Sequence, residues 1–168
     1  MIYLITGGQR SGKSSYAQEL ALSLTDEPIY VATARVWDDD FQARVERHQH
    51  DRDERWTTME VEKALGGLDL DGKVAVVDCI TLWLTNFFMD TDQNVERSLE
   101  LAKEELKQLF RQDATLILVT NEIGMGTHAA TESGRKFADM QGWMNQFIAE
   151  QADEVTLMVS GLPVKVRE

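Results

Sequence analysis

The chain starts with a short apolar run that leads directly into a glycine-rich loop and then into a helical stretch. Residues 2–6 are Ile-Tyr-Leu-Ile-Thr, and the loop reads Gly7-Gly8-Gln9-Arg10-Ser11-Gly12-Lys13-Ser14. Glycines leave room for backbone amides to wrap an anion, and the positive end of the following helix favours negative charge. The order strand, loop, helix is the context that the pattern Gly-x-x-x-x-Gly-Lys-Ser requires for phosphate binding. The eight loop residues therefore predict a nucleotide-binding phosphate loop (P-loop).

Three side chains of this loop are candidates for particular roles. Lys13 is expected to reach the β- and γ-phosphates of a nucleoside triphosphate, and the Ser14 hydroxyl is expected to ligate Mg²⁺. Arg10 either makes a further phosphate contact or lies in solvent, and the residues alone leave both possibilities open.

A site of this kind also needs an acid at the end of another buried strand, to hold Mg²⁺ directly or through water. Asp78 closes the apolar run Val74-Ala75-Val76-Val77. Burying an unpaired carboxylate is costly, so this position favours a cation partner. The alternative is that Asp78 caps a helix that begins near Cys79. Under the first interpretation, Lys13, Ser14 and Asp78 form a triphosphate site with Mg²⁺, and the phosphoryl acceptor remains open.

Short apolar runs alternate with helical stretches along the rest of the chain. Further strands are expected at 29–33, 74–78, 116–120 and 155–160, with weaker candidates at 57–61 and 163–166. Apolar residues recur at helical spacing within 17–24, 95–110 and 137–148. Near-continuous runs of Ile, Val and Leu are typical of strands buried on both faces. The pattern predicts a single α/β domain over residues 1–168, P-loop NTPase-like, with a mostly parallel central sheet and helices on both faces.

Polar residues close several of these strands. Thr6, Thr33, Asp78 and Thr120 should share the carboxyl edge of the sheet, where ligands of such folds bind. The loop 121–133 should lie at the same edge and cover the acceptor, unless it is an ordinary crossover.

The charge balance excludes some partners. The chain has 29 acidic and 17 basic residues and a net charge of −12. Proteins that coat nucleic acid or dock on anionic membranes usually present a basic face, so neither partner is expected. One cysteine, Cys79, excludes an intrachain disulfide. No apolar run approaches the roughly 18 residues of a membrane span, and the start lacks the basic region of a signal peptide. A cytoplasmic protein is therefore expected.

The stretch 35–55 reverses this charge balance locally. It holds five basic residues, Arg35, Arg44, Arg47, Arg52 and Arg55, and two histidines, His48 and His50. A solvent-facing helix laced with i,i+4 ion pairs explains the charges. It explains the histidines less well, because a histidine can act as nucleophile or base near pH 7. Two residues apart, they would point to different sides of a helix, so no zinc site is expected.

Several motifs resemble one family across the whole chain. They are Thr6-Gly7-Gly8-x-Arg10-Ser11-Gly12-Lys13-Ser14, Tyr30-Val31-Ala32-Thr33-Ala34, Arg44-Val45-x-x-His48-x-x-x-Arg52-x-x-x-Trp56, Asp78-Cys79-Ile80-Thr81, Thr120-Asn121-Glu122-Ile123-Gly124-x-Gly126 and Val159-Ser160-Gly161-Leu162-Pro163. The chain is similar to the bifunctional adenosylcobinamide kinase / adenosylcobinamide-phosphate guanylyltransferases of cobalamin biosynthesis. The P-loop is shared by many families, whereas the Arg-x-x-x-His-x-x-x-Arg segment and the Asn-Glu-Ile-Gly-x-Gly loop are more specific.

The resemblance implies a role for each matching residue. His48 would be covalently guanylylated. Nucleotide contacts would come from the residues of the P-loop together with Thr33, Ala34, Arg35, His48, Gln49, His50, Asp51, Glu60 and Asp78. The family often has Glu where Asp78 stands, and a proline where Thr127-His128 stands. A homotrimer is also implied.

Two reactions follow from the resemblance. The γ-phosphoryl of ATP or GTP would pass to the hydroxyl of the aminopropanol arm of adenosylcobinamide. His48 would then take GMP from GTP, release pyrophosphate and pass GMP to adenosylcobinamide phosphate. The alternatives are a monofunctional small-molecule P-loop kinase and, from another class, a nucleotide-dependent regulatory switch.

Overall fold

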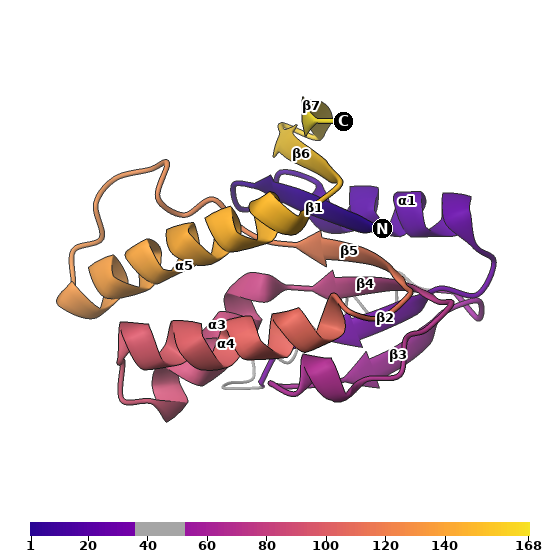
Figure 1. Cartoon of the computed structure of the whole chain (residues 1–168). Coiled ribbons are helices and arrows are strands. Elements are labelled where there is room, and N and C mark those ends of the chain that lie inside the picture. Colours follow the sequence, from indigo (N-terminus) through magenta and orange to yellow (C-terminus); the bar gives the residue numbers. More distant parts are fainter. Residues whose placement is uncertain (36–52) are drawn as a thin grey trace.

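The computed structural model describes residues 1–35 and 53–168. Within them a sheet of seven strands has the order β3-β2-β4-β5-β1-β6-β7 (Figure 1). The strands are β1 (Ile2–Gly7), β2 (Ile29–Ala32), β3 (Thr57–Glu60), β4 (Val74–Asp78), β5 (Thr115–Val119), β6 (Glu154–Val159) and β7 (Leu162–Arg167). The six strands β1 to β6 are all parallel to their neighbours among one another, and only the edge strand β7 of this described sheet pairs antiparallel, with β6. The predicted mostly parallel sheet is confirmed.

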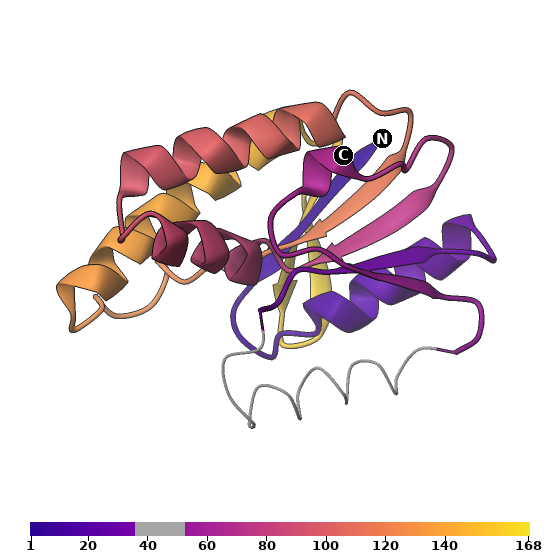
Figure 2. The ribbon, with the colours of Figure 1, turned by 90° about the horizontal axis from the view of Figure 1, so that it is seen from below.

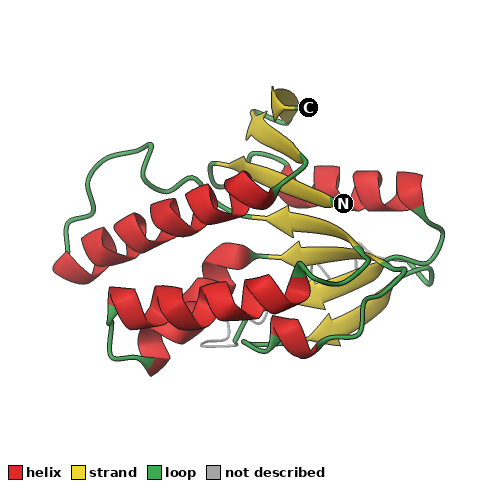
Figure 3. Cartoon of the chain, in the orientation of Figure 1, coloured by secondary structure: helices red, strands yellow, loops and turns green. Residues whose placement is uncertain are grey.

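Helices cover both faces of this sheet. They are α1 (Lys13–Leu24), α3 (Ile80–Asp90), α4 (Val95–Leu109), α5 (Glu132–Gln151) and the short 3-10 helix η1 (Leu65–Gly67). α1 lies on the face opposite to α4 and α5 (Figure 2). Figure 3 shows the strands of the sheet with helices packed around them. The helix α3 was not among the predicted helical stretches, whereas the P-loop NTPase-like fold class is confirmed.

Alternate residues of the strands belong to two different hydrophobic clusters, one on each face of the sheet. Tyr3 and Ile5 of β1 pack in the cluster with Ala17 and Ala21 of α1. Leu4, between them, belongs to the larger cluster that α3, α4 and α5 complete. Successive side chains of a strand point to opposite faces, so one strand supplies both layers.

The aromatic group on α3 belongs to the core. The side chains of Trp83, Phe87 and Phe88 are buried. The Trp83 indole donates a hydrogen bond of 2.9 Å to the carbonyl of Lys63, and its ring meets Phe87 edge-on at 4.9 Å between centroids. From the sequence such an aromatic group could serve either the core or a subunit interface, and the burial of all three side chains shows core packing.

Polar side chains set the starts of two helices. The Asn94 side chain accepts a hydrogen bond from the backbone N–H of Arg97 at the start of α4. Thr131 accepts one from the N–H of Gly134 at the start of α5. Each cap satisfies an amide that the helix itself leaves unpaired.

β5 separates β1, which leads into the P-loop, from β4, which ends at Asp78. In the register of the sheet, Val119 pairs with Ile5 on one side and with Asp78 on the other. The residues that follow β5 therefore emerge between the P-loop and Asp78. The predicted strands 29–33 and 116–120 each end one residue earlier than expected, at Ala32 and Val119. Thr33 and Thr120 are nevertheless fully buried at this edge.

Candidate active site

The P-loop owes its shape to two glycines that other residues could not replace. Gly7 has φ of +149°, and a Cβ there would lie 2.6 Å from the carbonyl oxygen of Met158. Gly12 has φ of +92°, and a Cβ there would lie 3.2 Å from the Cα of Gly161. The backbone of the β6–β7 hairpin therefore packs directly against the loop, which only glycine permits at these positions.

The β6–β7 hairpin braces the loop through its turn. Ser160 and Gly161 both have positive φ, 51° and 84°, as in the tight two-residue turns that match the twist of a hairpin. The N–H of Gly161 donates a hydrogen bond of 3.0 Å to the carbonyl of Ser11. Gly161 stands in one of the family motifs, but the sequence indicates no role for it, because this contact joins segments 150 residues apart.

Lys13 lies buried beneath the loop. Its ammonium donates to the carbonyl of Gly8 at 2.5 Å and to the hydroxyl of Ser11 at 3.4 Å. Burial lowers the pKa of Lys13, while Cys79 and Asp78 act in the opposite direction. A cation held by a carbonyl and a hydroxyl of the loop and desolvated in this way is suited to bind phosphate oxygens strongly, since water competes less for it.

Asp78 is held by a tyrosine of the neighbouring strand. The phenol of Tyr30 on β2 donates a hydrogen bond of 3.0 Å to Oδ2 of Asp78. The helix cap proposed as an alternative is not formed, because α3 begins after Cys79 without a side-chain cap. Thr33, one residue beyond β2, donates to the carbonyl of Cys79 at 2.8 Å. The carboxylate thus closes β4 at the edge of the sheet where the P-loop lies.

The oxygen ligands at this edge of the sheet fit a magnesium ion that is bound together with a nucleotide. A carboxylate and a hydroxyl are hard oxygen ligands, and Mg²⁺ is usually held by one or two such groups plus phosphates and waters. No cluster of three or more metal-binding side chains occurs among the described residues. Asp78 at the end of β4 and Ser14 near the start of α1 supply one carboxylate and one hydroxyl of this kind.

A second polar group lies beyond β5. The backbone N–H of Glu122 donates to the carbonyl of Gly7 at 3.1 Å. Its Oε1 accepts hydrogen bonds from the hydroxyl of Thr6 at 3.1 Å and from the side-chain amide of Asn145 at 3.0 Å. Asn145 is itself held by Thr120 at 2.8 Å and by Gln141 at 2.9 Å. Glu122 was not among the predicted site residues, because it lies three residues beyond β5, whereas Asp78 is the last residue of β4.

Arg35 and Glu60 lie at the carboxyl ends of β2 and β3. The Arg35 guanidinium bonds Glu62 at 2.8 Å and Asp90 at 2.9 Å. These partners raise the pKa of Arg35, and Arg35 with Lys63 lowers the pKa of Asp90. Glu60 is exposed and pairs in register with Ala32.

The predicted nucleotide contacts lie partly inside and partly outside the described residues. Gly8, Gln9 and Arg10 are exposed on the P-loop, and Arg10 has a positive φ of 56°. Ala34 follows Thr33 beyond the end of β2. His48, Gln49, His50, Asp51 and most of the polar stretch 35–55 lie outside the described residues.

The sheet order, the P-loop between β1 and α1, and the acid that closes β4 define a P-loop nucleotide-binding protein. A family model described as cobinamide kinase / cobinamide phosphate guanyltransferase matches residues 3–166. The chain belongs to this family, whose members are kinases and nucleotidyltransferases, and the resemblance noted from the motifs is confirmed.

Relatives match along nearly their full length. The bifunctional adenosylcobalamin biosynthesis protein CobU of Escherichia coli strain K12 is 36% identical to this chain. The match spans 99% of this chain and 100% of the relative. CobP of Pseudomonas aeruginosa, with the same description, is 37% identical and covers 98% of this chain and 96% of the relative. CobU of Salmonella typhimurium is 37% identical over 99% of this chain and 100% of the relative.

Solved structures resemble the chain less closely. The flagellar accessory protein FlaH from Methanocaldococcus jannaschii has a TM-score of 0.48 at 14% identity, covering 99% of this chain and 77% of that one. The RadB recombinase has a TM-score of 0.47 at 13% identity, covering 93% of this chain and 73% of that one. At these values the assignment rests on the sheet order, the P-loop and the family match.

Proposed function

We propose that the chain carries out both reactions of its family at one edge of one sheet, within a single domain over residues 1–168. The first reaction transfers the γ-phosphoryl of ATP or GTP to the hydroxyl of adenosylcobinamide. The second transfers GMP from GTP to adenosylcobinamide phosphate, giving adenosylcobinamide-GDP and pyrophosphate. The observation that carries this proposal is the family match over residues 3–166, together with a P-loop whose buried lysine lies beside Asp78.

The residues of the P-loop suit the kinase reaction. Phosphoryl transfer depends mainly on positioning and on neutralising the charge of the phosphates. The amides from Gly7 to Ser14 would bind the phosphates, and Lys13 would leave the Gly8 carbonyl to contact the β- and γ-oxygens. Asp78 and Ser14 would hold Mg²⁺, which supplies charge neutralisation at the phosphates when it is bound.

The guanylyl transfer needs a nucleophile, and we infer that it is His48. The support is the Arg-x-x-x-His-x-x-x-Arg-x-x-x-Trp segment, which matches the family. Neutral imidazole would attack the α-phosphorus of GTP and expel pyrophosphate, and the acceptor phosphate would then displace the histidine. The same family match supports further nucleotide contacts, which we propose at Arg35, Gln49, His50, Asp51 and Glu60. Arg35, Arg47 and Arg52 are proposed to offset the charge of the two anionic partners.

Incubation with α-labelled GTP tests this assignment. Label that remains on the denatured protein, is lost in acid and is absent from His48→Ala would support a guanylyl-histidine. The control is γ-phosphoryl transfer to cobinamide, which His48→Ala should retain. A wild-type chain that phosphorylates cobinamide but takes up no label would instead be a monofunctional kinase.

We also infer that the chain works as a cytoplasmic homotrimer. No helix of the described residues is long and apolar enough to cross a membrane. Val159, Leu162, Val164 and Val166 on the β6–β7 edge expose between 48% and 69% of their surfaces. Apolar side chains in a row on an edge strand are typical of an interface. Sedimentation equilibrium would support the trimer by a mass three times 19.1 kDa, and a monomer mass at micromolar concentration would contradict it.

A further inference from the structure

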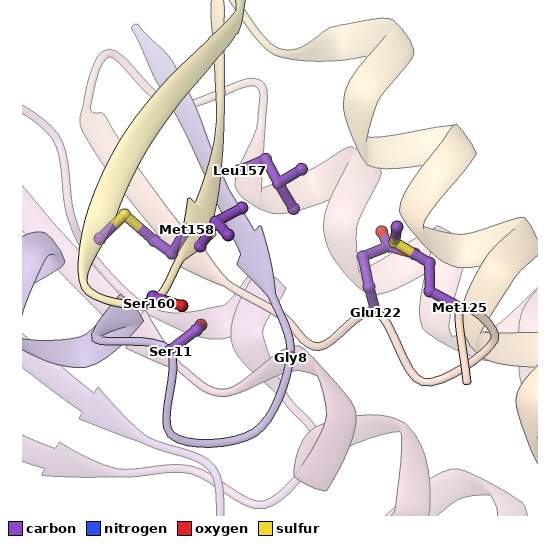
Figure 4. A pocket seen from close by; sticks show the side chains of 8 residues that line it. Gly8, Ser11, Glu122, Met125, Leu157, Met158 and Ser160 are labelled. Atoms are coloured by element: carbon purple, nitrogen blue, oxygen red, sulfur yellow. The ribbon is translucent and has the colours of Figure 1, made fainter. Parts of the chain in front are cut away.

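A pocket of about 300 Å³ opens beside the P-loop. Gly8 and Ser11 border it from the loop, Glu122 and Met125 from the segment after β5, and residues 157–160 from the β6–β7 hairpin. Leu157 faces Glu122 and Met125 across the opening (Figure 4). The walls are largely apolar, and Glu122 is the only ionisable side chain among the described residues that line the pocket.

Glu122 is oriented by neutral hydrogen-bond donors. The Thr6 hydroxyl and the Asn145 side-chain amide both donate hydrogen bonds to Oε1, and the backbone N–H of Glu122 donates one to the carbonyl of Gly7. In the described part of the chain no basic side chain forms an ion pair with this carboxylate, and Oε2 accepts no hydrogen bond. Asn145 is held in turn by two buried partners, Thr120 directly after β5 and Gln141 on α5. A whole network thus fixes the carboxylate while leaving one oxygen available to a ligand.

A carboxylate held in this way is suited to an alcohol and not to a phosphate. A hydroxyl can donate its proton to Oε2, whereas an anionic phosphate would be repelled by the uncompensated charge. The apolar walls favour a hydroxyl carried on an alkyl arm. A volume of about 300 Å³ admits such an arm, while the body of a large acceptor would remain outside against the exposed Met125.

We propose that this pocket receives the hydroxyl-bearing arm of the phosphoryl acceptor, and that Glu122 accepts the proton of its hydroxyl. This inference rests on the proposed kinase function. The hydroxyl oxygen forms a bond to the γ-phosphorus, and the bond from that phosphorus to the β–γ bridging oxygen breaks. The nucleoside diphosphate leaves with that oxygen, and the hydroxyl proton passes to Glu122 and then to solvent. Once phosphorylated, the arm is repelled by Glu122 and leaves the pocket, which frees its phosphate for the second reaction.

The variant Glu122→Gln tests the proposal, because it keeps the shape and most hydrogen bonds but removes the base. We expect kcat/KM for cobinamide phosphorylation to fall about 10²- to 10⁴-fold, the usual contribution of a general base. Labelling by α-labelled GTP and guanylyl transfer to supplied cobinamide phosphate should stay at the wild-type rate, since neither uses Glu122.

Two further variants separate this role from a structural one. Met125→Ser changes a side chain that is 74% exposed and should raise the KM for cobinamide about three- to tenfold without changing kcat or the KM for nucleotide. Glu132→Gln removes an exposed carboxylate that pairs with Lys136 at 2.7 Å on α5, and should leave all rates unchanged. Phosphorylation by Glu122→Gln within threefold of wild type would overturn the proposal, as would an equal loss of GTP labelling. A wild-type chain that labels with GTP but phosphorylates no cobinamide would overturn the proposed kinase function, and this inference with it.

Discussion

The phenol of Tyr30 donates a 3.0 Å hydrogen bond to the carboxylate of Asp78 across two adjacent parallel strands. The Tyr30 ring is held in turn by Trp56, which meets it edge-on with 6.2 Å between centroids. Tyr30 is buried and packs on the α1 face of the sheet. The acid proposed to bind Mg²⁺ is therefore oriented by a rigid aromatic side chain.

Replacing Tyr30 by Phe should weaken Mg²⁺ binding without unfolding the protein. Partners that orient metal ligands typically contribute 10- to 100-fold to metal affinity. We expect the Mg²⁺ concentration that gives half-maximal kinase activity to rise about tenfold, with activity mostly restored at saturating Mg²⁺. Titration of Mg²⁺ at fixed ATP measures this. The matched control is Tyr3→Phe, which changes a buried tyrosine near the N-terminal end of β1, at the far end of that strand from the P-loop. An equal rise in the Mg²⁺ requirement of this variant would contradict the role assigned to Tyr30.

Replacing Lys13 by Met should reduce phosphoryl transfer about 10²- to 10³-fold, as expected for the loss of one charged phosphate contact. It should not lower the midpoint of thermal unfolding, because burial lowers the pKa of this lysine and so disfavours its charged form. Steady-state kinetics and thermal melts are the two measurements. A large fall in the melting temperature would show that the bond to Gly8 is structural.

Gly161→Ala should raise the KM for nucleotide, because the turn that bonds Ser11 would move. The residue has φ of +84°, so alanine there costs about 1 kcal/mol of stability. Gly72→Ala is a matched control at φ of +70° in the turn before β4, away from the P-loop. Both variants should lose similar unfolding free energy in denaturant titrations, and only Gly161→Ala should change nucleotide KM. Unchanged KM in both would mean that the hairpin does not hold the loop.

Cys79 should resist thiol reagents while the protein is folded. Burial, and after it the charge of Asp78, raises the pKa of its thiol to about 12. At pH 8 such a thiol is ionised to about one part in ten thousand, against about a quarter for an ordinary cysteine. The rate of modification should therefore follow unfolding. Fast labelling in native buffer would contradict this.

The same pKa has a consequence for stability in alkali. The folded state keeps the thiol proton above the pKa of the unfolded chain, which is about 8.5. The unfolded chain then releases protons that the folded chain retains, so the thiol lowers the free energy of unfolding as pH rises from about 8.5 to about 12. Cys79→Ala should show a shallower decline over this range in denaturant titrations. Equal slopes would show that the thiol does not contribute.

The sequence determined the features whose cause is local. The glycines and lysine of the P-loop, the alternation of strand and helix, and Asp78 at the end of an apolar run depend on neighbours a few residues away. Strand ends were predicted to within a residue or two for the same reason. The family motifs added His48, whose chemistry no spacing argument could assign.

Tertiary structure decided the relationships between distant segments. The order of the strands brings Tyr30 to Asp78, the β6–β7 turn to Ser11, and Glu122 to Thr6. It also made Trp83 a core residue rather than an interface residue. None of these follows from a local pattern, because backbone pairing in a parallel sheet joins strands that are far apart in the chain. The P-loop could be read from eight residues, whereas the pocket beside it exists only because three separate segments meet there.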